Sequence, residues 1–568
     1  MIHPLDLRQT PYSCRGSYLA LSFLNENHHG YGNAASLHLR TLHNSTITPL
    51  IARLTLHCAG EPCMPASLLE DAALRLENGG KVLECCFAND RTLLFRGGPG
   101  CSLTLDFLTE NGPYDYIYPL LHEGRTLYMA NCYKNNCQYL IVPQHGDCEL
   151  DQQWEESSSL WSRLTFSGDA GFRFALLEIE TEWDQVLPEE DFDAARARTD
   201  ADFRTFRSAF PALPEACRAM GDLAVYVDWS CLVRPDGFLR REGMLMSKNW
   251  MNNVWSWDHC FNALALADCH PEIAWDAYII MADHQDVSGR LPDSISSQHV
   301  IWNYCKPPIH GWALRRLMAH MTLSPRQLEE AYDFLSRWTL WWMNFRRRDG
   351  LYYYNHGNDS GWDNATAFSL LPPIATPELQ AFMIVQMEML SDLARRLNRT
   401  EDAQRWQSEA DHHLEVFLAR CFRDDLPVAI QLSTGQIVEN ESLLPYEILV
   451  LGERLPARVR EKVISLVGSE KFFTAHGFAT ESPASPFYRD DGYWRGPIWA
   501  PSTLLMIDGL EKCGAAELAQ EAARRFVDMA AANGFAENYD ALTGKGLRDL
   551  AYTWTASVAL VLARDYLA

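Results

Sequence analysis

The chain lacks any apolar stretch near the roughly 20 residues that a membrane-spanning helix needs. Its first residues, Met1-Ile-His-Pro-Leu-Asp-Leu-Arg8, contain no basic segment followed by an apolar one, so the pattern of a secretory signal is missing as well. These two absences predict a cytoplasmic protein that makes no contact with a membrane.

Positive charge is also scarce. The 568 residues include 49 Lys and Arg against 74 Asp and Glu, which gives a formal net charge of −25. A surface that binds nucleic acid or an anionic membrane needs clustered Lys and Arg, so the composition argues against both partners. The expected partner is a small molecule, and the expected state is a monomer or a small homo-oligomer.

The 16 cysteines form no pair of C-x-x-C motifs, so the pattern of a zinc site is missing. We predict that they are reduced and mostly buried, as is usual in the cytoplasm. The triplet Asp411-His412-His413 contains metal-binding residue types, but helical spacing predicts a solvated face for these side chains. Neither a metal nor a cofactor is predicted.

Tryptophan, in contrast, is abundant. Most of the 18 Trp residues follow residue 225, in the same part of the chain as several acidic loops. Aromatic rings beside acids are a weak sign of a carbohydrate site, because a ring can stack on the apolar face of a pyranose. Trp338 and Trp342 are expected in a helical core instead, since they share one helix face with Leu335.

Two hydrophobic patterns divide the chain into a multidomain protein. Residues 1–187 contain short alternating segments between Gly, Asn, Asp and Pro clusters, which is typical of an all-β sandwich. Residues 188–212 form a charged, helical linker, and from 213 to 568 the apolar spacing is close to 3.6 residues. About ten to twelve helices fit there, one of them with Thr376 as N-cap and Pro377 at the first helical position. The predicted strand segments are Leu54–Leu56, Leu103–Phe107, Leu140–Val142, Leu164–Phe166 and Phe172–Phe174.

Long loops rich in Trp, Asp, Gly and Pro connect these helices, so the pattern predicts an all-α toroid with its chemistry in the loops at one end. The loop Asn358-Asp-Ser-Gly-Trp-Asp-Asn364 holds two carboxylates, a glycine and an indole within seven residues. A desolvated carboxyl group can keep a proton near neutral pH, as acid catalysis requires. The same residue types also form ordinary turns, so this loop alone does not distinguish a site from a turn.

Three further loop regions carry acids. Isolated buried carboxylates are costly, so four acid-bearing loop regions in one helical domain favour a saccharide site over simple packing. The three regions are Trp255–Asp258, His284–Ser294 with Cys305–Pro308, and Asp490–Trp499 with Ala536–Gly544.

In their order along the chain, these loops resemble the trehalase and processing α-glucosidase group, glycoside hydrolase families 37 and 63. Gly361-Trp-Asp-Asn364 is similar to the motif of that group's general acid, and Glu537-Asn-Tyr-Asp540 to the motif of its general base. The resemblance spans about residues 245–560. It implies an (α/α)6 toroid behind a β-sandwich and a mechanism that inverts the anomeric carbon. Its other loop motifs are matched by Trp494-Arg-Gly-Pro-Ile-Trp499, Trp257-Asp258, Gly289–Asp293 and Lys306–Pro308.

On this resemblance Asp363 is the general acid and Glu537 the general base. The residues leave alternatives open: Asp359 is the rival acid, Glu481 is the rival base, and Asp363 could instead cap a helix. The predicted substrate-binding residues are Trp257, Asp258, Gln285, Asp293, Lys306, Trp362, Trp494, Arg495, Trp499 and Tyr539.

The leading prediction is an inverting exo-α-glycosidase of the α-glucosidase type, acting on a small soluble α-glucoside or oligosaccharide. Asp293 and Lys306 stand where trehalases usually have Asn and Gln, which argues against trehalose itself. The alternative is a mannosyl- or glucosyl-glycerate hydrolase, in which Lys306 and Arg495 would meet the carboxylate of the aglycone. A second alternative, a non-catalytic carbohydrate-binding toroid, leaves the pair Asp363 and Glu537 without a purpose.

Overall fold

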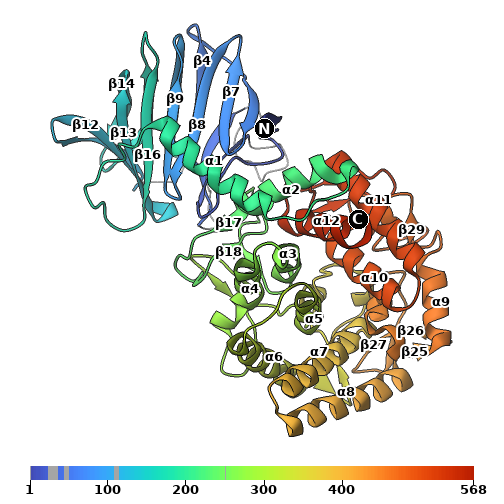
Figure 1. Ribbon diagram of the computed structural model, residues 1–568. Helices are drawn as coiled ribbons and strands as arrows, with labels where there is room; N and C mark the ends of the chain where they lie inside the picture. Colours follow the sequence, from blue (N-terminus) through green and yellow to red (C-terminus); the bar gives the residue numbers. More distant parts are fainter. Residues whose placement is uncertain (1, 24–35, 44–49, 108–113, 250) are drawn as a thin grey trace.

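The computed structural model describes residues 2–23, 36–43, 50–107, 114–249 and 251–568. In this part of the chain two antiparallel β-sheets come first and a helical domain follows, with helix α1 (Phe192–Ser208) between them (Figure 1). The predicted order, a β-sandwich and then helices, is confirmed, and each of the five predicted strand segments lies within a strand of these sheets.

The two sheets pack against each other through aromatic side chains. Phe166 of one sheet stacks on Phe174 of the other with ring centroids 3.8 Å apart, and Phe174 also stacks on Phe95 at 4.6 Å. In spatial order, the described strands of the first sheet are β1 (Ile2–Pro4), β6 (Ala66–Glu70), β7 (Ala73–Asn78), β8 (Lys81–Asn89), β9 (Thr92–Gly97), β16 (Phe172–Ile179), β13 (Cys137–His145), β12 (Arg125–Cys132) and β11 (Tyr116–His122). Those of the second are β14 (Asp147–Glu155), β15 (Ser158–Ser167), β10 (Cys101–Phe107), β4 (Leu50–Cys58), β3 (Leu37–Thr41) and β2 (Leu19–Phe23), with β5 (Glu61–Pro62) paired to β4.

Helix α1 lies across the first sheet and leads into the helical domain (Figure 1). Its N-cap Asp191 accepts hydrogen bonds from the backbone amides of Asp193 and Ala194. Thr199 Oγ1 donates to the carbonyl of Phe87 in β8 at 2.7 Å, which ties the helix to the sheet. The helix therefore packs as part of the sandwich surface as well as connecting the two domains.

Six helices of the described residues contact one another in a closed cycle. Helix α3 packs against α5, α5 against α7, α7 against η6, η6 against α10, α10 against α12, and α12 against α3. These are α3 (Asp258–Leu266), α5 (His310–His320), α7 (Pro377–Arg396), η6 (Leu444–Arg454), α10 (Ala500–Lys512) and α12 (Thr553–Tyr566). Helices that alternate with them along the chain pack outside the cycle, and Figure 1 shows the resulting ring. They are α2 (Arg218–Cys231), α4 (Pro271–Ile279), α6 (Pro325–Phe345), α8 (Thr400–Arg420), α9 (Ala457–Val467) and α11 (Ala516–Asn533).

The sequence explains which helices lie inside. Most residues of α10 from Ala500 to Leu510 are apolar, and all residues in this range are buried. In the outer helix α6 only one face is buried, and it includes the predicted core residues Trp338 and Trp342. Helix α7 begins at Pro377 after Thr376, as predicted, although the Thr376 hydroxyl bonds to Glu378 and not to a backbone amide.

One local prediction is wrong. Asp411 and His412 are exposed, but His413 is fully buried and contacts the ring of Tyr352 edge-on at 4.6 Å. The buried residues of helix α8 are three or four positions apart, so His413 lies on the buried face with Ala403, Trp406, Ala410 and Phe417. Across the described ranges the 16 cysteines are free thiols and most are buried, as predicted. No helix in those ranges is long and apolar enough to cross a membrane.

Short hairpins and small sheets shape the loops between the helices. Those that carry candidate site residues are β19 (Val254–Trp255), β20 (Ser294–Ile295) and β21 (Val300–Ile301) in one sheet, and β31 (Asn538–Tyr539) with β32 (Gly546–Leu547) in another. The remaining pairs are β17 (Leu232–Val233) with β18 (Gly243–Met244), β22 (Arg347–Arg348) with β23 (Leu351–Tyr352), β25 (Phe422–Arg423) with β26 (Leu426–Pro427), β29 (Phe473–Thr474) with β30 (Gly477–Phe478), and the triplet β24 (Ile374–Ala375), β27 (Ala429–Gln431) and β28 (Gln436–Val438).

Candidate active site

The loop that carries Asp363 is fixed by a glycine and two indoles. The short 3-10 helix η4 (Gly357–Ser360) ends at Gly361, whose φ of +77° is a left-handed conformation that favours glycine. A Cβ atom at Gly361 would lie 2.4 Å from the ring of Trp257, so this position also lacks room for a side chain. Trp362 is fully buried and stacks on Trp494 with centroids 4.6 Å apart. The packing leaves Asp363 at the end of a rigid turn.

The environment of Asp363 favours its protonated form. Burial raises the pKa of this carboxyl group above its usual value, and the nearby charge of Asp293 raises it further. Lys306 and His356 act in the opposite direction, but the net shift is upward. Because Asp363 is only partly buried, its carboxyl group combines a raised pKa with remaining access to a ligand.

Glu537 precedes β31 and is 5% exposed. Burial raises its pKa to about 8, the charges of Asp549 and Asp363 add to this, and Arg548 and a hydrogen bond from Tyr493 oppose it. Because the charge of Asp363 acts on Glu537, the fold brings these two carboxyl groups, distant in sequence, close enough to interact.

Two further acidic side chains, Asp293 and Asp258, lie near the buried ammonium of Lys306. Its Nζ lies 3.3 Å from Asp293 Oδ1 and donates to the backbone carbonyl of Asn358 at 3.0 Å. Asp258, at the start of α3, is buried, and burial raises its pKa to about 8 although Lys306 lowers it. Asp258 Oδ2 accepts no hydrogen bond from any described residue. A sugar hydroxyl could satisfy this carboxyl oxygen.

Tryptophan rings form a continuous stack beside these acids. Trp494 stacks on Trp499 with centroids 4.0 Å apart and planes 8° apart, and its centroid lies 6.2 Å from that of Trp257. Trp554 of α12 contacts both Trp257 and Trp499 edge-on. All of these rings are buried, so the direct role that the structure gives them is to support the loops.

Three of the predicted substrate-binding residues donate hydrogen bonds within the protein, although Gln285 Oε1 accepts none from a described residue. Gln285 Nε2 donates to the carbonyls of Gly289 and Phe334, which directs it toward α6. The hydroxyl of Tyr539 donates to the carbonyl of Gly534 at 2.6 Å, and the Trp499 indole donates to the carbonyl of Tyr493. The pattern of residue types could not reveal these internal bonds, which tie Gln285 and Tyr539 to neighbouring segments; their role in substrate binding stays a prediction.

Sequence reasoning missed Tyr493 and Asp549. Tyr493 has a φ of +63°. Burial raises the pKa of its hydroxyl, the charges of Glu537, Asp363 and Asp258 raise it further, and Arg548 opposes them. Tyr493 directly precedes the motif Trp494–Trp499, and this position could have marked it as a candidate site residue. Asp549 lies beside Glu537 in space, and no motif in the sequence marked it.

The rival acid and base are occupied by internal bonds. Asp359 is 2% exposed, accepts from the backbone amides of Asn355 and Cys305, and pairs with Arg346 at 3.0 Å. Glu481 accepts from the hydroxyls of Thr366 and Ser485, each at 2.6 Å. A buried carboxyl group whose oxygens accept bonds from the protein itself is fixed in place and has little access to a substrate, which suits a structural role.

Replacing Asp359 with asparagine is therefore expected to destabilise the fold. The substitution removes one partner of a buried ion pair, and we expect a loss of about 3 kcal/mol in the free energy of unfolding. Denaturant unfolding of this variant beside Asp363→Asn measures the difference, since the second substitution breaks no ion pair among the described residues. A stable but inactive Asp359→Asn variant would instead return Asp359 to the role of acid.

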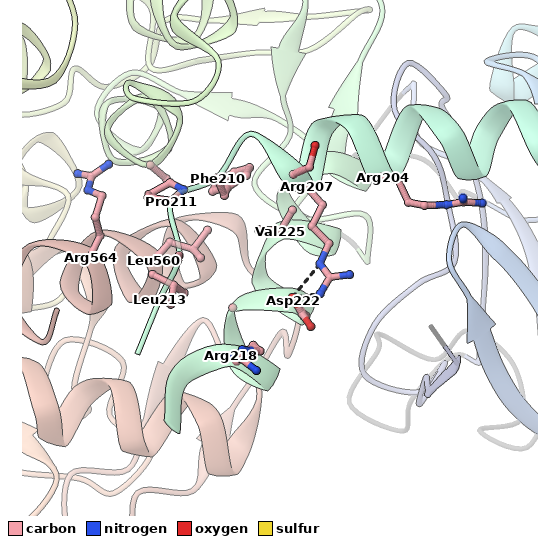
Figure 2. Close-up of a pocket in the computed structure, with 14 residues that line it drawn as sticks. Arg204, Arg207, Phe210, Pro211, Leu213, Arg218, Asp222, Val225, Leu560 and Arg564 are labelled. Carbon is pink, nitrogen blue, oxygen red and sulfur yellow. Dashed lines mark hydrogen bonds and ion pairs between the residues drawn. The ribbon is translucent and has the colours of Figure 1, made fainter. Parts of the chain in front are cut away.

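Two other kinds of feature could hold ligands. In the described chain, possible metal ligands form three groups with ligand atoms within 4.8 Å of one another: His259 with Cys260 and His310, His43 with Cys137 and Glu178, and His43 with Glu180 and Asp236. These groups also bond within the protein, as His259 Nδ1 does to the Trp255 carbonyl and His43 Nδ1 to Asp236. A cavity of about 500 Å³ lies at the junction of α1, α2 and α12 (Figure 2). No candidate site residue lines it, and its arginines are ion-paired, as Arg207 is with Asp222. We assign no ligand to either kind of feature.

The comparison with protein families decides the class of this site. Residues 251–555 match the family described as the mannosylglycerate hydrolase MGH1-like glycoside hydrolase domain. The chain belongs to this family. It is a glycoside hydrolase, which overturns the non-catalytic alternative and confirms the resemblance to the family 63 group.

Individual relatives of the chain are also glycoside hydrolases. A glucosylglycerate hydrolase from Mycolicibacterium hassiacum is 23% identical over 410 residues, which cover 54% of this chain and 91% of the relative. A solved family 63 mannosylglycerate hydrolase from Thermus thermophilus, in complex with glucose, has a TM-score of 0.52 at 20% identity and covers 60% of this glycoside hydrolase and 99% of that chain. A bacterial glucoamylase complexed with acarbose has a TM-score of 0.65 at 12% identity and covers 99% and 94%. The last likeness includes the β-sandwich, which the family match does not reach.

Proposed function

We propose that this glycoside hydrolase cleaves a hexosyl-glycerate, a glucosyl- or mannosylglycerate, into a hexose and glycerate. The family match over residues 251–555 carries this proposal, together with relatives that are named for these two substrates. It replaces the leading prediction, an α-glucosidase of neutral glucosides, with the alternative that the sequence left open.

We infer an inverting mechanism with Asp363 as general acid and Glu537 as general base. The acid must hold a proton at working pH and give it to the glycosidic oxygen, and the raised pKa of Asp363 suits that step. The base takes a proton from a water molecule, whose oxygen then attacks the anomeric carbon from the opposite face. The site keeps the two carboxyl groups distinct, because Lys306 and His356 act on Asp363 while Arg548 and Tyr493 act on Glu537.

The sugar is expected to lie against Asp258, Asp293 and Lys306. These three groups can bind hydroxyls as acceptors and donors, and the unsatisfied Oδ2 of Asp258 supports this placement. The buried indoles of Trp257, Trp362 and Trp494 lie behind these groups and would hold the loops that carry them.

The aglycone is expected on the side of the acid, because the acid protonates the leaving oxygen. Arg495 lies there: its Nε donates at 2.6 Å to the carbonyl of Asn364, the residue after Asp363. Its two terminal nitrogens donate to no described residue, so they are available to a glycerate carboxylate.

We further propose that the helical domain is an (α/α)6 toroid over residues 213–568, preceded by the sandwich of residues 1–187 and the linker of 188–212. The closed cycle of six inner helices, each alternating along the chain with an outer one, supports this architecture. A site built from loops at one end of such a ring agrees with the place of the loops that carry Asp258, Asp363 and Glu537.

A neutral α-glucoside remains the second candidate for one reason. Lys306, the buried cation of the site, is already paired with Asp293 and bonded to Asn358, so it adds little net positive charge for an anion. Arg495 is therefore expected to matter for binding a glycosyl-glycerate but not for binding a neutral α-glucoside.

Replacing Arg495 with methionine is expected to separate them. A charged hydrogen bond contributes roughly 1.5–3 kcal/mol, so KM for glucosylglycerate and mannosylglycerate should rise about tenfold or more. Neutral α-linked disaccharides should be hydrolysed as before. The measurement is steady-state kinetics on both substrate sets, with NMR of the first product to identify its anomer.

Arg489→Met is the matched control, since Arg489 lies in the same loop and bonds only to backbone carbonyls of that loop among described residues. Efficient cleavage of neutral disaccharides together with no cleavage of glycosyl-glycerates would support the α-glucosidase. A product that retains the anomeric configuration would contradict the inverting mechanism.

A further inference from the structure

The β-sandwich reaches the proposed base through a short segment of the chain, Ser247–Asn249, which lies just before the family match. Lys248 is 1% exposed, and its ammonium donates to Ser13 Oγ at 2.9 Å and to the carbonyls of Cys14 and Ser17. These three residues precede β2 and belong to the β-sandwich part of the chain. The side chain of Lys248 is thus anchored in the other domain.

The backbone of the same segment is held from a strand. Arg40 in β3 is buried, and its Nη1 donates to the carbonyl of Lys248 and to Ser22 Oγ, both at 3.1 Å. Burying two cations at a domain interface is expensive, and apolar side chains of similar volume would often give equal or greater stability. These charged contacts therefore indicate that the position of the segment Ser247–Asn249 matters more than the stability that its contacts add to the fold.

Asn249 continues the chain of contacts toward the site. Its Nδ2 donates to the carbonyl of Gln9 at 3.0 Å and to Asp549 Oδ1 at 2.8 Å, so one amide group joins the two domains. Asp549 Oδ1 also accepts from the backbone amide of Ala551 at 3.0 Å. The carbonyl of Asp549 accepts from the backbone amide of Glu537 at 2.6 Å.

Charge follows the same path as the hydrogen bonds. After burial, Asp549 is the first of the groups that raise the pKa of Glu537, ahead of Asp363, and Arg548 and Tyr493 oppose them. Tyr552 also faces Glu537. Arg40 lowers the pKa of Asp549, which burial raises, so a cation of the β-sandwich favours the ionised form of the group beside the base.

We propose that the β-sandwich positions the catalytic base, with Asn249 and Asp549 as positioning residues that couple Gln9 and Arg40 to Glu537. The inference rests on the proposed function, because it takes Glu537 as the base. It gives the first domain a role in the reaction that the family match, which begins at residue 251, does not contain.

Asp549→Asn tests the coupling by charge. Asparagine keeps the oxygen that accepts from Asn249 and Ala551, and places its amide where Oδ2 accepts no bond from a described residue. Removing the negative charge should lower the pKa of Glu537, so the base stays ionised to lower pH. We expect the acid limb of kcat/KM to move down by about half a pH unit or more.

Asn249→Ala tests the coupling by position. Misplacing a catalytic group by a fraction of an ångström is costly, so we expect kcat to fall about tenfold or more while KM changes less than about twofold. Asn252→Ala is the control, since Asn252 is also buried and its Nδ2 donates to the Leu42 carbonyl of the same β-sandwich. It loosens the interface without touching Asp549, and its kcat should stay near that of the parent.

Two results would overturn the proposal: an Asp549→Asn variant with the parent's pH profile, or an Asn249→Ala variant no slower than Asn252→Ala. If one of the two variants fails to fold, the measurement on the other is enough to test the proposal. A Glu537→Gln variant measured beside them separates the two levels. If Glu537→Gln is as active as the parent, the proposed function fails; if it is inactive while Asp549→Asn and Asn249→Ala behave like the parent, only this inference fails.

Discussion

Replacing Asp363 with asparagine is expected to lower kcat on a glycosyl-glycerate by about 100- to 10 000-fold, the usual contribution of a general acid. The glycerate oxygen is a poor leaving group unless it is protonated as the bond breaks. Asparagine fills the same space beside Trp362 but has no acidic proton to give. Steady-state kinetics on glucosylglycerate and mannosylglycerate measure the loss.

The leaving group supplies the control for this variant. In a glycosyl fluoride the leaving group is the fluoride ion, which needs no protonation. Asp363→Asn should therefore cleave this substrate at a rate close to that of the parent. Thermal unfolding should also be close to that of the parent, because Asp363 forms no ion pair with any residue that the structure describes. A variant that is equally slow on the fluoride would show that Asp363 has a role other than that of the acid.

Replacing Glu537 with glutamine is expected to cause a loss of similar size, about 100- to 10 000-fold in kcat, but on both types of substrate. The base activates water whatever the leaving group is, so a glycosyl fluoride should not restore the activity. Comparing the two variants on a glycosyl fluoride therefore distinguishes the acid from the base, which neither loss of activity does alone.

The pH profile gives a second measurement on Glu537. A base must be ionised, so kcat/KM of the parent falls as the pH falls through its pKa. Because burial and the charge of Asp549 raise that pKa to about 8, the acid limb should lie well above the usual glutamate value near 4.3. The residual activity of Glu537→Gln should lack this limb. Since the two carboxyl groups interact, the limbs of the parent report the pair and not one residue.

An unchanged acid limb in Glu537→Gln would identify a different base, and Glu481 would then be the first residue to test. The structure argues against that outcome, because both oxygens of Glu481 accept short hydrogen bonds from hydroxyls. Together the two variants and the Arg495 experiment address the acid, the base and the aglycone separately.

The sequence by itself determined the order of the domains and predicted which loops carry the chemistry. Alternation along β10 and the helical spacing of Trp338 and Trp342 are local patterns, so they can be read without the fold. The motifs around Asp363 and Glu537 are also continuous in sequence. For the same reason the family could be suspected from the residues alone.

Only the tertiary structure decided what depends on contacts between distant residues. Asp359 and Asp363 lie four positions apart in the same loop, and the ion pair with Arg346 is what assigns the first to the scaffold. Gln285 and Tyr539 are predicted to bind substrate, and only the fold shows that both side chains donate to backbone carbonyls. Burial and neighbouring charge set each carboxyl pKa, and both come from chain segments far away in sequence. Asp549 and its link to the β-sandwich carry no motif, because a position beside Glu537 exists only once the two domains have packed together.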